Sequence, residues 1–192
     1  MIHVVEMFIY SLSNRIPPGP VNILSASYGK KYGFLNSVSF LYGAAVGSVI
    51  LTFVLGMGDI NSEQDFPKFA NLLKYFGGFY MIYIAISMLV HGEETTLESC
   101  VEGKFTQGVL IQWVNPKTWA IAALGLSKFG CSNESLLIYL SIEFVIACLG
   151  IAIWAFIGEQ ISKFFSSSWQ QKMLNAFLGI ALAASAIHTI VG

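Results

Sequence analysis

The chain consists of long apolar stretches separated by short polar connections. A helix that spans a bilayer needs about 20 mostly apolar residues, and six stretches of roughly that length are present. They run over Ile2–Tyr28, Phe34–Met57, Phe69–Val90, Phe105–Leu126, Leu136–Ile157 and Met173–Val191. Apolar and polar residues do not alternate as they do in membrane β-strands. The pattern therefore predicts an all-α polytopic membrane protein with six transmembrane helices in one domain, residues 1–192.

Proline interrupts two of these stretches. The first contains SNRIPPGPVN, residues Ser13–Asn22, and the fourth contains Asn-Pro-Lys, residues Asn115–Lys117. Proline removes a backbone donor and obstructs the carbonyl four residues earlier. Unpaired backbone groups persist at membrane depth only where protein or a wet cavity surrounds them. We therefore expect the first and fourth helices to be broken, with polar helix ends facing a cavity.

The two halves of the chain resemble each other. After each break come apolar residues and then Lys-aromatic-Gly, at Lys31–Gly33 and at Lys128–Gly130. Leu73–Ile86 and Leu174–Ile187 also align. Three helices per copy would place the second copy upside down, and inverted repeats with interrupted helices are typical of secondary transporters. The predicted boundaries are about 1–91 for the first repeat, 92–104 for an acidic connecting loop and 105–192 for the second repeat.

Composition supports the membrane interpretation and narrows the possible functions. Charged residues make up 11% of the chain and hydrophobic residues 55%, whereas soluble domains carry about 25% charged residues. The net charge of −1 and the lack of a basic cluster exclude a nucleic-acid partner. Cys100, Cys131 and Cys148 form no Cys-x-x-Cys pair. We therefore expect no metal site and no cofactor.

Charged side chains inside the apolar stretches are candidates for function, since each costs about 2.5–3.5 kcal/mol at a helix centre. Lys117 lies beside a break, which favours a functional role. Arg15 could line the site or extend to the interface. Glu143 could form a structural pair with Lys117 or Arg15, or it could equally carry a proton. His188 lies near the end of the last stretch and is predicted to be interfacial.

Small and amide residues have architectural interpretations. Gly43 and Gly47 share one face of the second stretch, which suits close helix packing, and Gly179 in the sixth stretch could act similarly. Asn14, Asn22 and Asn115 flank the breaks. Their amide groups could satisfy the freed backbone or contact a solute.

The order of these motifs resembles the LysE/RhtB family of amino-acid exporters. Pro-Gly-Pro-x-Asn over Pro18–Asn22 is followed by Gly-x-x-x-Gly over Gly29–Gly33, by glycines in the second stretch and by Asn115–Lys117. The resemblance covers essentially the whole chain. It implies export of amino acids across the cytoplasmic membrane, driven by the proton gradient. The substrate-binding residues that it implies are Pro18, Gly19, Pro20, Asn22, Asn115, Pro116 and Lys117.

Two features depart from the family pattern. Ser48 follows Gly47 where many members have an acidic residue, and Arg15 before the prolines is unusual. We add Arg15 to the predicted substrate site and Glu143 as the proton-coupling candidate. In this hypothesis half-helix amides and Lys117 hold the carboxylate of an amino acid, while backbone carbonyls or Glu143 hold its ammonium. Expected partners are the amino acid, protons and membrane lipid, with a homo-oligomer possible.

Two alternatives remain open at this point. A divalent-cation exporter of the same superfamily would need several inward carboxylates or other hard oxygen ligands, and Glu143 alone is placed for that. A non-transporting membrane scaffold or an intramembrane enzyme is the other. We see no nucleophile–base pair such as Gly-x-Ser-x-Gly, so no enzymatic activity is predicted.

Overall fold

The computed structural model describes residues 3–57, 66–91, 104–130, 132–165 and 167–191. Within these ranges the regular structure is helical and contains no strand. The helices are α1 Val4–Arg15, α2 Pro20–Tyr32, α3 Phe34–Met57, α4 Phe66–His91, α6 Phe105–Trp113, α7 Pro116–Phe129, α8 Asn133–Phe164 and α9 Ser168–Val191. The predicted all-α class is confirmed for the part of the chain that the structure describes.

Both proline clusters break the helices where the sequence predicted. The first apolar stretch is divided into α1 and α2 by residues 16–19, and the fourth is divided into α6 and α7 by residues 114–115. The helix ends differ more from the prediction. For example, α8 extends to Phe164 instead of Ile157. The helix continues through the charged residues that follow the apolar stretch. Nζ of Lys163 lies 2.5 Å from Oε1 of Glu159 one turn earlier, and such a pair stabilises a helix.

Length and apolar composition single out two of the described helices, α3 and α8, as able to cross a membrane unaided. The breaks explain why the first and fourth stretches do not qualify. Their halves have 12, 13, 9 and 14 residues, and each is shorter than the roughly 20 residues that a crossing needs. Two half-helices in series are needed to reach that length.

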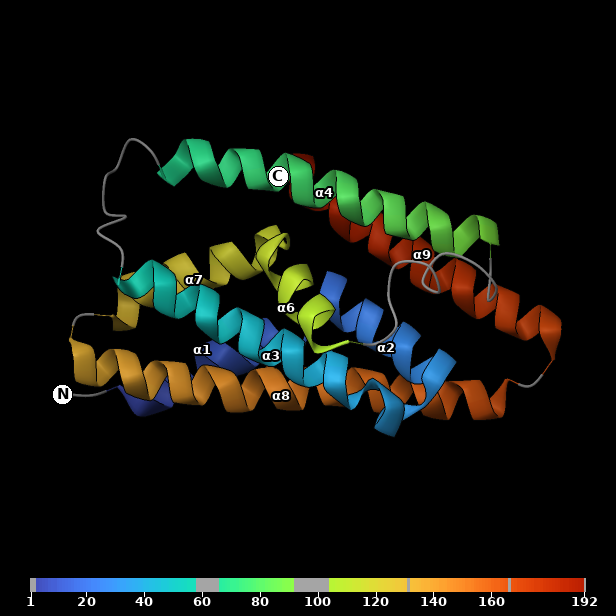
Figure 1. The fold of residues 1–192 in the computed structure, drawn as a ribbon, viewed down its shortest axis with the longest axis horizontal. Helices are drawn as coiled ribbons and strands as arrows, with labels where there is room; N and C mark the ends of the chain where they lie inside the picture. Colours follow the sequence, from blue (N-terminus) through green and yellow to red (C-terminus); the bar gives the residue numbers. More distant parts are fainter. Residues whose placement is uncertain (1–2, 58–65, 92–103, 131, 166, 192) are drawn as a thin grey trace.

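The helices pack into one bundle (Figure 1). α4 and α9 lie side by side on one side of the molecule, and α8 runs along the opposite side. α1 and α2 pack against α8, α6 packs against α3, and α3 and α8 contact each other. The main core is built from residues of α2, α3, α4, α8 and α9 with Ile111 of α6, and in it the Tyr28 ring stacks on Phe40 at a centroid distance of 4.2 Å. Of the half-helices, α2 is held deepest in the bundle, with every residue from Pro20 to Gly29 buried.

Glycines permit the closest helix crossings, as the sequence predicted for Gly43 and Gly47. A Cβ atom on Gly43 would lie 2.0 Å from the Phe105 carbonyl oxygen, and one on Gly108 would lie 2.1 Å from that of Phe40. α3 and α6 therefore touch backbone to backbone. The predicted packing role of Gly179 is also borne out, since its Cβ would lie 3.1 Å from the Ala85 carbonyl oxygen of α4.

Large apolar side chains cover the outside of the bundle. Phe76 on α4 is 69% exposed and Phe177 on α9 is 68% exposed, and many further Leu, Ile, Val and aromatic side chains are exposed as well. A soluble monomer rarely exposes so much contiguous apolar surface. This surface fits contact with lipid.

Some predicted features lie outside the described residues. These are Cys100, Cys131 and the predicted acidic loop apart from Lys104. Cys148 is half-buried in α8 and is a free thiol.

Candidate functional site

The first break is held open by side chains that bind its freed carbonyl groups. The Asn22 side-chain amide donates to the carbonyl oxygens of Arg15 and Pro17, each at 2.9 Å. The indole N–H of Trp154 on α8 donates to the Ile16 carbonyl at 2.9 Å. The predicted structural role of Asn22 is therefore present. Each of these carbonyls accepts a bond from a protein donor, and each oxygen retains a second lone pair.

The start of α2 lacks such a partner. Its N-cap residue, Gly19, has extended backbone and no side chain caps the helix. Pro20 at the first helical position has no N–H to offer, so the amides that follow form the positive end of α2. A helix start of this kind attracts a carboxylate. The half-helix that the sequence predicts to begin near Val21 is present.

The second break is closed by a different set of bonds. The Asn115 side-chain oxygen accepts from the Lys117 backbone N–H at 3.1 Å and caps α7. The Trp119 indole donates to the Trp113 carbonyl at 2.7 Å, and the Thr118 hydroxyl donates to the Gln112 side-chain oxygen at 2.6 Å. This break is rigidly organised by neutral polar groups within a few residues of it.

α4 covers the outer side of the second break. A Cβ on Gly77 would lie 1.9 Å from the Val114 carbonyl oxygen and 2.9 Å from Cδ of Pro116. The glycine of α4 therefore allows direct contact with the break. Pro116 contributes to this packing contact.

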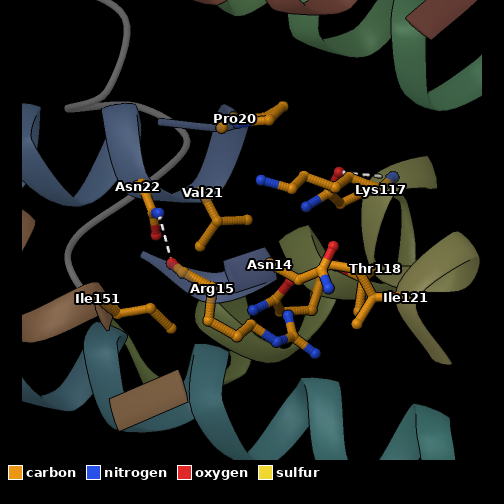
Figure 2. A pocket seen from close by; sticks show the side chains of 12 residues that line it. Asn14, Arg15, Pro20, Val21, Asn22, Lys117, Thr118, Ile121 and Ile151 are labelled. Atoms are coloured by element: carbon orange, nitrogen blue, oxygen red, sulfur yellow. Dashed lines mark hydrogen bonds between the residues drawn. The ribbon is translucent and has the colours of Figure 1, made fainter. Parts of the chain in front are cut away.

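The two breaks meet at a small pocket with a cavity volume of about 20 Å³ (Figure 2). It is lined by Asn14, Arg15, Gly19, Pro20, Val21, Asn22, Gln112, Asn115, Lys117, Thr118, Ile121 and Ile151. The lining comes from α1, the first break, α2, α6, the second break, α7 and α8. Segments far apart in the sequence thus build one small polar chamber with apolar walls.

Most of the predicted site residues come together in this pocket. The pocket contains Arg15, Gly19, Pro20, Asn22, Asn115 and Lys117. The predicted residues that do not line it are Pro18, which is exposed, Pro116, which packs on α4, and Glu143, which lies behind Arg15. The prediction missed Val21, Gln112, Thr118, Ile121 and Ile151 as lining residues. Only Gln112 and Thr118 carried a signal, as polar residues within three positions of Asn115.

Lys117 reaches from one break to the other. A Cβ atom built on Gly19 would lie 3.0 Å from Nζ of Lys117 and 3.2 Å from Cδ of the same lysine. In Figure 2 the side chain points from α7 toward α2, where Pro20 is drawn. Its ammonium has no hydrogen-bond partner among the described residues. A cation is therefore held beside the uncapped start of α2.

Arg15 and Glu143 form a buried ion pair behind the pocket. The Arg15 Nε donates to Oε1 of Glu143 at 2.6 Å, and Nη2 contacts the same oxygen. Arg15 is 8% exposed and Glu143 is fully buried. Oε2 of Glu143 has no partner within the described structure. Of the two predicted partners for Glu143, the structure selects Arg15.

The charges of this region leave the pocket positive. Glu143 neutralises Arg15, whereas nothing among the described residues neutralises Lys117. None of the side chains that line the pocket is a carboxylate. The described residues contain no group of three or more His, Cys, Asp or Glu that could hold a metal ion. The lining therefore offers a divalent cation neutral oxygens, such as those of the Asn and Gln side chains, and no carboxylate.

Comparison with protein families agrees with the motifs and with the helical architecture. The family model described as LysE type translocator matches residues 12–192. The chain therefore belongs to the LysE type translocator family, a family of membrane-embedded transporters. The family resemblance predicted from the sequence is confirmed.

Individual relatives match along nearly their full length. The cysteine/O-acetylserine efflux protein of Escherichia coli (strain K12) is 25% identical over 186 residues, which cover 93% of each chain. The protein of the same name from Klebsiella pneumoniae subsp. pneumoniae is 25% identical over 187 residues, which cover 95% of this chain and 94% of the relative. No solved structure matches this chain. These relatives are efflux transporters of amino acids rather than enzymes.

Proposed function

We propose that this protein exports a small amino acid across the cytoplasmic membrane through the pocket between the two breaks. One observation carries the proposal: the Lys117 ammonium, without a partner among the described residues, lies against Gly19 at the uncapped start of α2. A fixed cation and a helix start together form a binding site for a carboxylate. Every amino acid carries this group.

The remaining pocket walls fit the rest of such a solute. Asn14 and Asn22 donate their amide nitrogens to backbone carbonyls, Asn14 to Tyr10 at 2.8 Å. Their side-chain oxygens therefore remain available for a solute ammonium. Val21, Ile121 and Ile151 provide apolar wall for a side chain. The site is suited to a small zwitterion.

The relatives suggest which amino acids to test. Their names state cysteine and O-acetylserine as the solutes that they export. Both are small and carry no net charge as zwitterions, which agrees with the wall chemistry of the pocket. We propose cysteine or O-acetylserine as substrate.

We further propose six membrane crossings in two inverted repeats, in a multi-pass protein. The pattern of helix contacts supports this arrangement. α1 and α2 pack against α8, and their counterparts α6 and α7 pack against α3. α2 contacts α9 as α7 contacts α4. Exchanging the halves thus reproduces the packing, and rocking of one half against the other would expose the central pocket to each side in turn.

Proton coupling is the final part of the proposal, with Glu143 as the coupling residue. Its carboxylate is fully buried, has one oxygen without a partner and binds the Arg15 that lines the pocket. The buried hydroxyls of Ser11 and Tyr139, one turn before Arg15 and Glu143 on their helices, also lack partners among the described residues. Buried polar atoms are normally hydrogen-bonded, often to water. A proton crossing inward would supply about 2.3 kcal/mol per 100 mV.

The proposal is tested by counterflow of labelled cysteine into proteoliposomes loaded with unlabelled cysteine. Replacing Lys117→Met should reduce the initial rate by about tenfold or more, because a hydrogen bond to a charged group contributes about 1.5–3 kcal/mol. Lys128→Met is the matched control, since Lys128 is an exposed lysine at the other end of the same helix. Equal rates for Lys117→Met and the wild type would refute the proposed site.

A further inference from the structure

We infer that the pocket recognises its solute by the carboxylate and does not require the ammonium. The inference deepens the proposed function and rests on it. Its consequence is a substrate class: small carboxylates with zero or negative net charge are accepted, whether or not they carry an amine. Amines without a carboxylate and amino acids with a second cationic group are rejected.

The positive groups of the pocket are the first reason. Arg15 and Lys117 both line it, from opposite breaks. Glu143 compensates Arg15 but is not part of the lining, so a solute meets two cations and no carboxylate. A second positive charge on the solute would be placed beside like charges with no counter-ion, and such juxtapositions are strongly unfavourable in a desolvated site.

Spare hydrogen-bond donors are the second reason. Arg15 uses Nε and Nη2 for Glu143, which leaves Nη1 without a partner among the described residues. Gln112 is 1% exposed, and its side-chain oxygen accepts from Thr118 while its side-chain nitrogen has no partner in the described structure. With Lys117 and the start of α2, these donors belong to residues that all line one small pocket. A carboxylate accepts several such bonds at once.

The groups left for an ammonium are weaker. They are the neutral side-chain oxygens of Asn14 and Asn22 and the second lone pairs of the Arg15, Ile16 and Pro17 carbonyls, which already accept bonds from the protein. Bonds between an ion and a neutral partner lack the attraction of a counter-ion, and ion-paired bonds are the strong ones. Deleting the ammonium from the solute therefore removes less binding than deleting the carboxylate.

Two truncated analogues of cysteine separate these contributions without adding bulk. 3-Mercaptopropionate retains the carboxylate and lacks the ammonium, whereas cysteamine retains the ammonium and lacks the carboxylate. Each competes with labelled cysteine in the counterflow assay. We expect 3-mercaptopropionate to inhibit at concentrations at least about tenfold lower than cysteamine, the ratio expected when one charged hydrogen bond is lost. Equal inhibition, or stronger inhibition by cysteamine, would overturn the inference.

A binding measurement keeps this test separate from the proposed transport. The unfolding temperature of the purified protein in detergent should rise with 3-mercaptopropionate and stay unchanged with cysteamine, since a ligand that binds the folded state stabilises it. If labelled cysteine shows no counterflow, the proposed function fails while this shift still decides what the pocket recognises. A shift with cysteamine alone, or with neither analogue, contradicts carboxylate recognition.

Substitutions of Lys117 test whether this lysine is the cation that binds the carboxylate. Lys117→Gln should reduce the stabilisation by 3-mercaptopropionate, and Lys128→Gln should leave it at the wild-type value. An undiminished shift in Lys117→Gln would show that the carboxylate binds elsewhere.

Discussion

Arg15 and Lys117 are two cations at one pocket, but their surroundings give them different tasks. The charge of Arg15 is balanced by Glu143 inside the bundle. The charge of Lys117 lacks a counter-ion among the described residues and faces the other break. The structure thus separates a compensated cation, which can tie the pocket to a buried acid, from an uncompensated one that can bind a solute.

The Arg15–Glu143 pair leads to a stability prediction. Removing one partner leaves a buried charge alone, so Arg15→Met or Glu143→Met should each lower the free energy of unfolding by about 3–5 kcal/mol. The double variant should lose much less than the sum, since it buries no unpaired charge. Unfolding of the purified variants in detergent measures the three values. Additive losses would show that the pair does not interact.

The same acid leads to a prediction about coupling. Glu143→Gln retains the shape of the side chain and an oxygen that can accept from Arg15, but it cannot gain or lose a proton. We expect this variant to exchange labelled cysteine across liposomes while failing to accumulate it against a gradient when a pH difference is imposed. Glu134→Gln, on the exposed first turn of α8, is the control. Accumulation by Glu143→Gln at the wild-type level would make the carboxyl purely structural.

At the scale of elements, the broken helices depend on close packing against unbroken ones. Gly43→Val would place side-chain atoms where the Phe105 backbone lies, since even a Cβ would be 2.0 Å from that carbonyl oxygen. Overpacking of this kind costs about 1–3 kcal/mol or more. We expect a lower unfolding temperature and reduced transport.

The control for this prediction is Ile50→Val, a change on the exposed side of α3. It should leave both the unfolding temperature and the transport rate near the wild-type values. If Gly43→Val unfolds at the same temperature as this control, α3 and α6 are not in backbone contact.

The breaks were predictable from the sequence because proline acts locally, through its own ring and its missing N–H. The partners of the freed carbonyls were not. Trp154 caps the Ile16 carbonyl from 138 positions away, and no local pattern contains that contact. Likewise, the sequence left Glu143 with two possible partners, and only the packing of α1 on α8 brings Arg15 to it.

Some of the residues that line the pocket were likewise predictable from the sequence, and others were not. Lys117 and Asn115 stood out because charged and amide groups are rare in apolar stretches. Ile121 and Ile151 resemble every other apolar residue of the chain, so nothing in the sequence distinguished a pocket wall from a lipid-facing surface. Pro116 was expected to bind the substrate, but it packs against Gly77 of α4, a contact that depends on the tertiary arrangement.

At the scale of the whole molecule, the proposed topology predicts which ends face which side of the membrane. The start of α3 lies at the carboxyl end of α8, where the Phe34 backbone N–H donates to Glu159 at 2.8 Å. The turn before α8 lies at its other end. An α-helix rises about 1.5 Å per residue, so a helix of 32 residues separates these two points by more than a bilayer core.

Cysteine labelling tests this separation. In a chain whose own cysteines are replaced by serine, Asn36→Cys and Glu134→Cys each place a thiol at an exposed position. A maleimide that cannot cross membranes should label one of them in intact cells and the other only in inside-out vesicles. Labelling of both from the same side would rule out the proposed crossing of α8.

The most direct test of the whole account is a crystal structure of the protein with bound L-cysteine. We predict that the solute carboxylate lies between Nζ of Lys117 and the first amides of α2, within hydrogen-bond distance of both. A solute bound outside this pocket, or one whose carboxylate contacts neither group, would contradict the account.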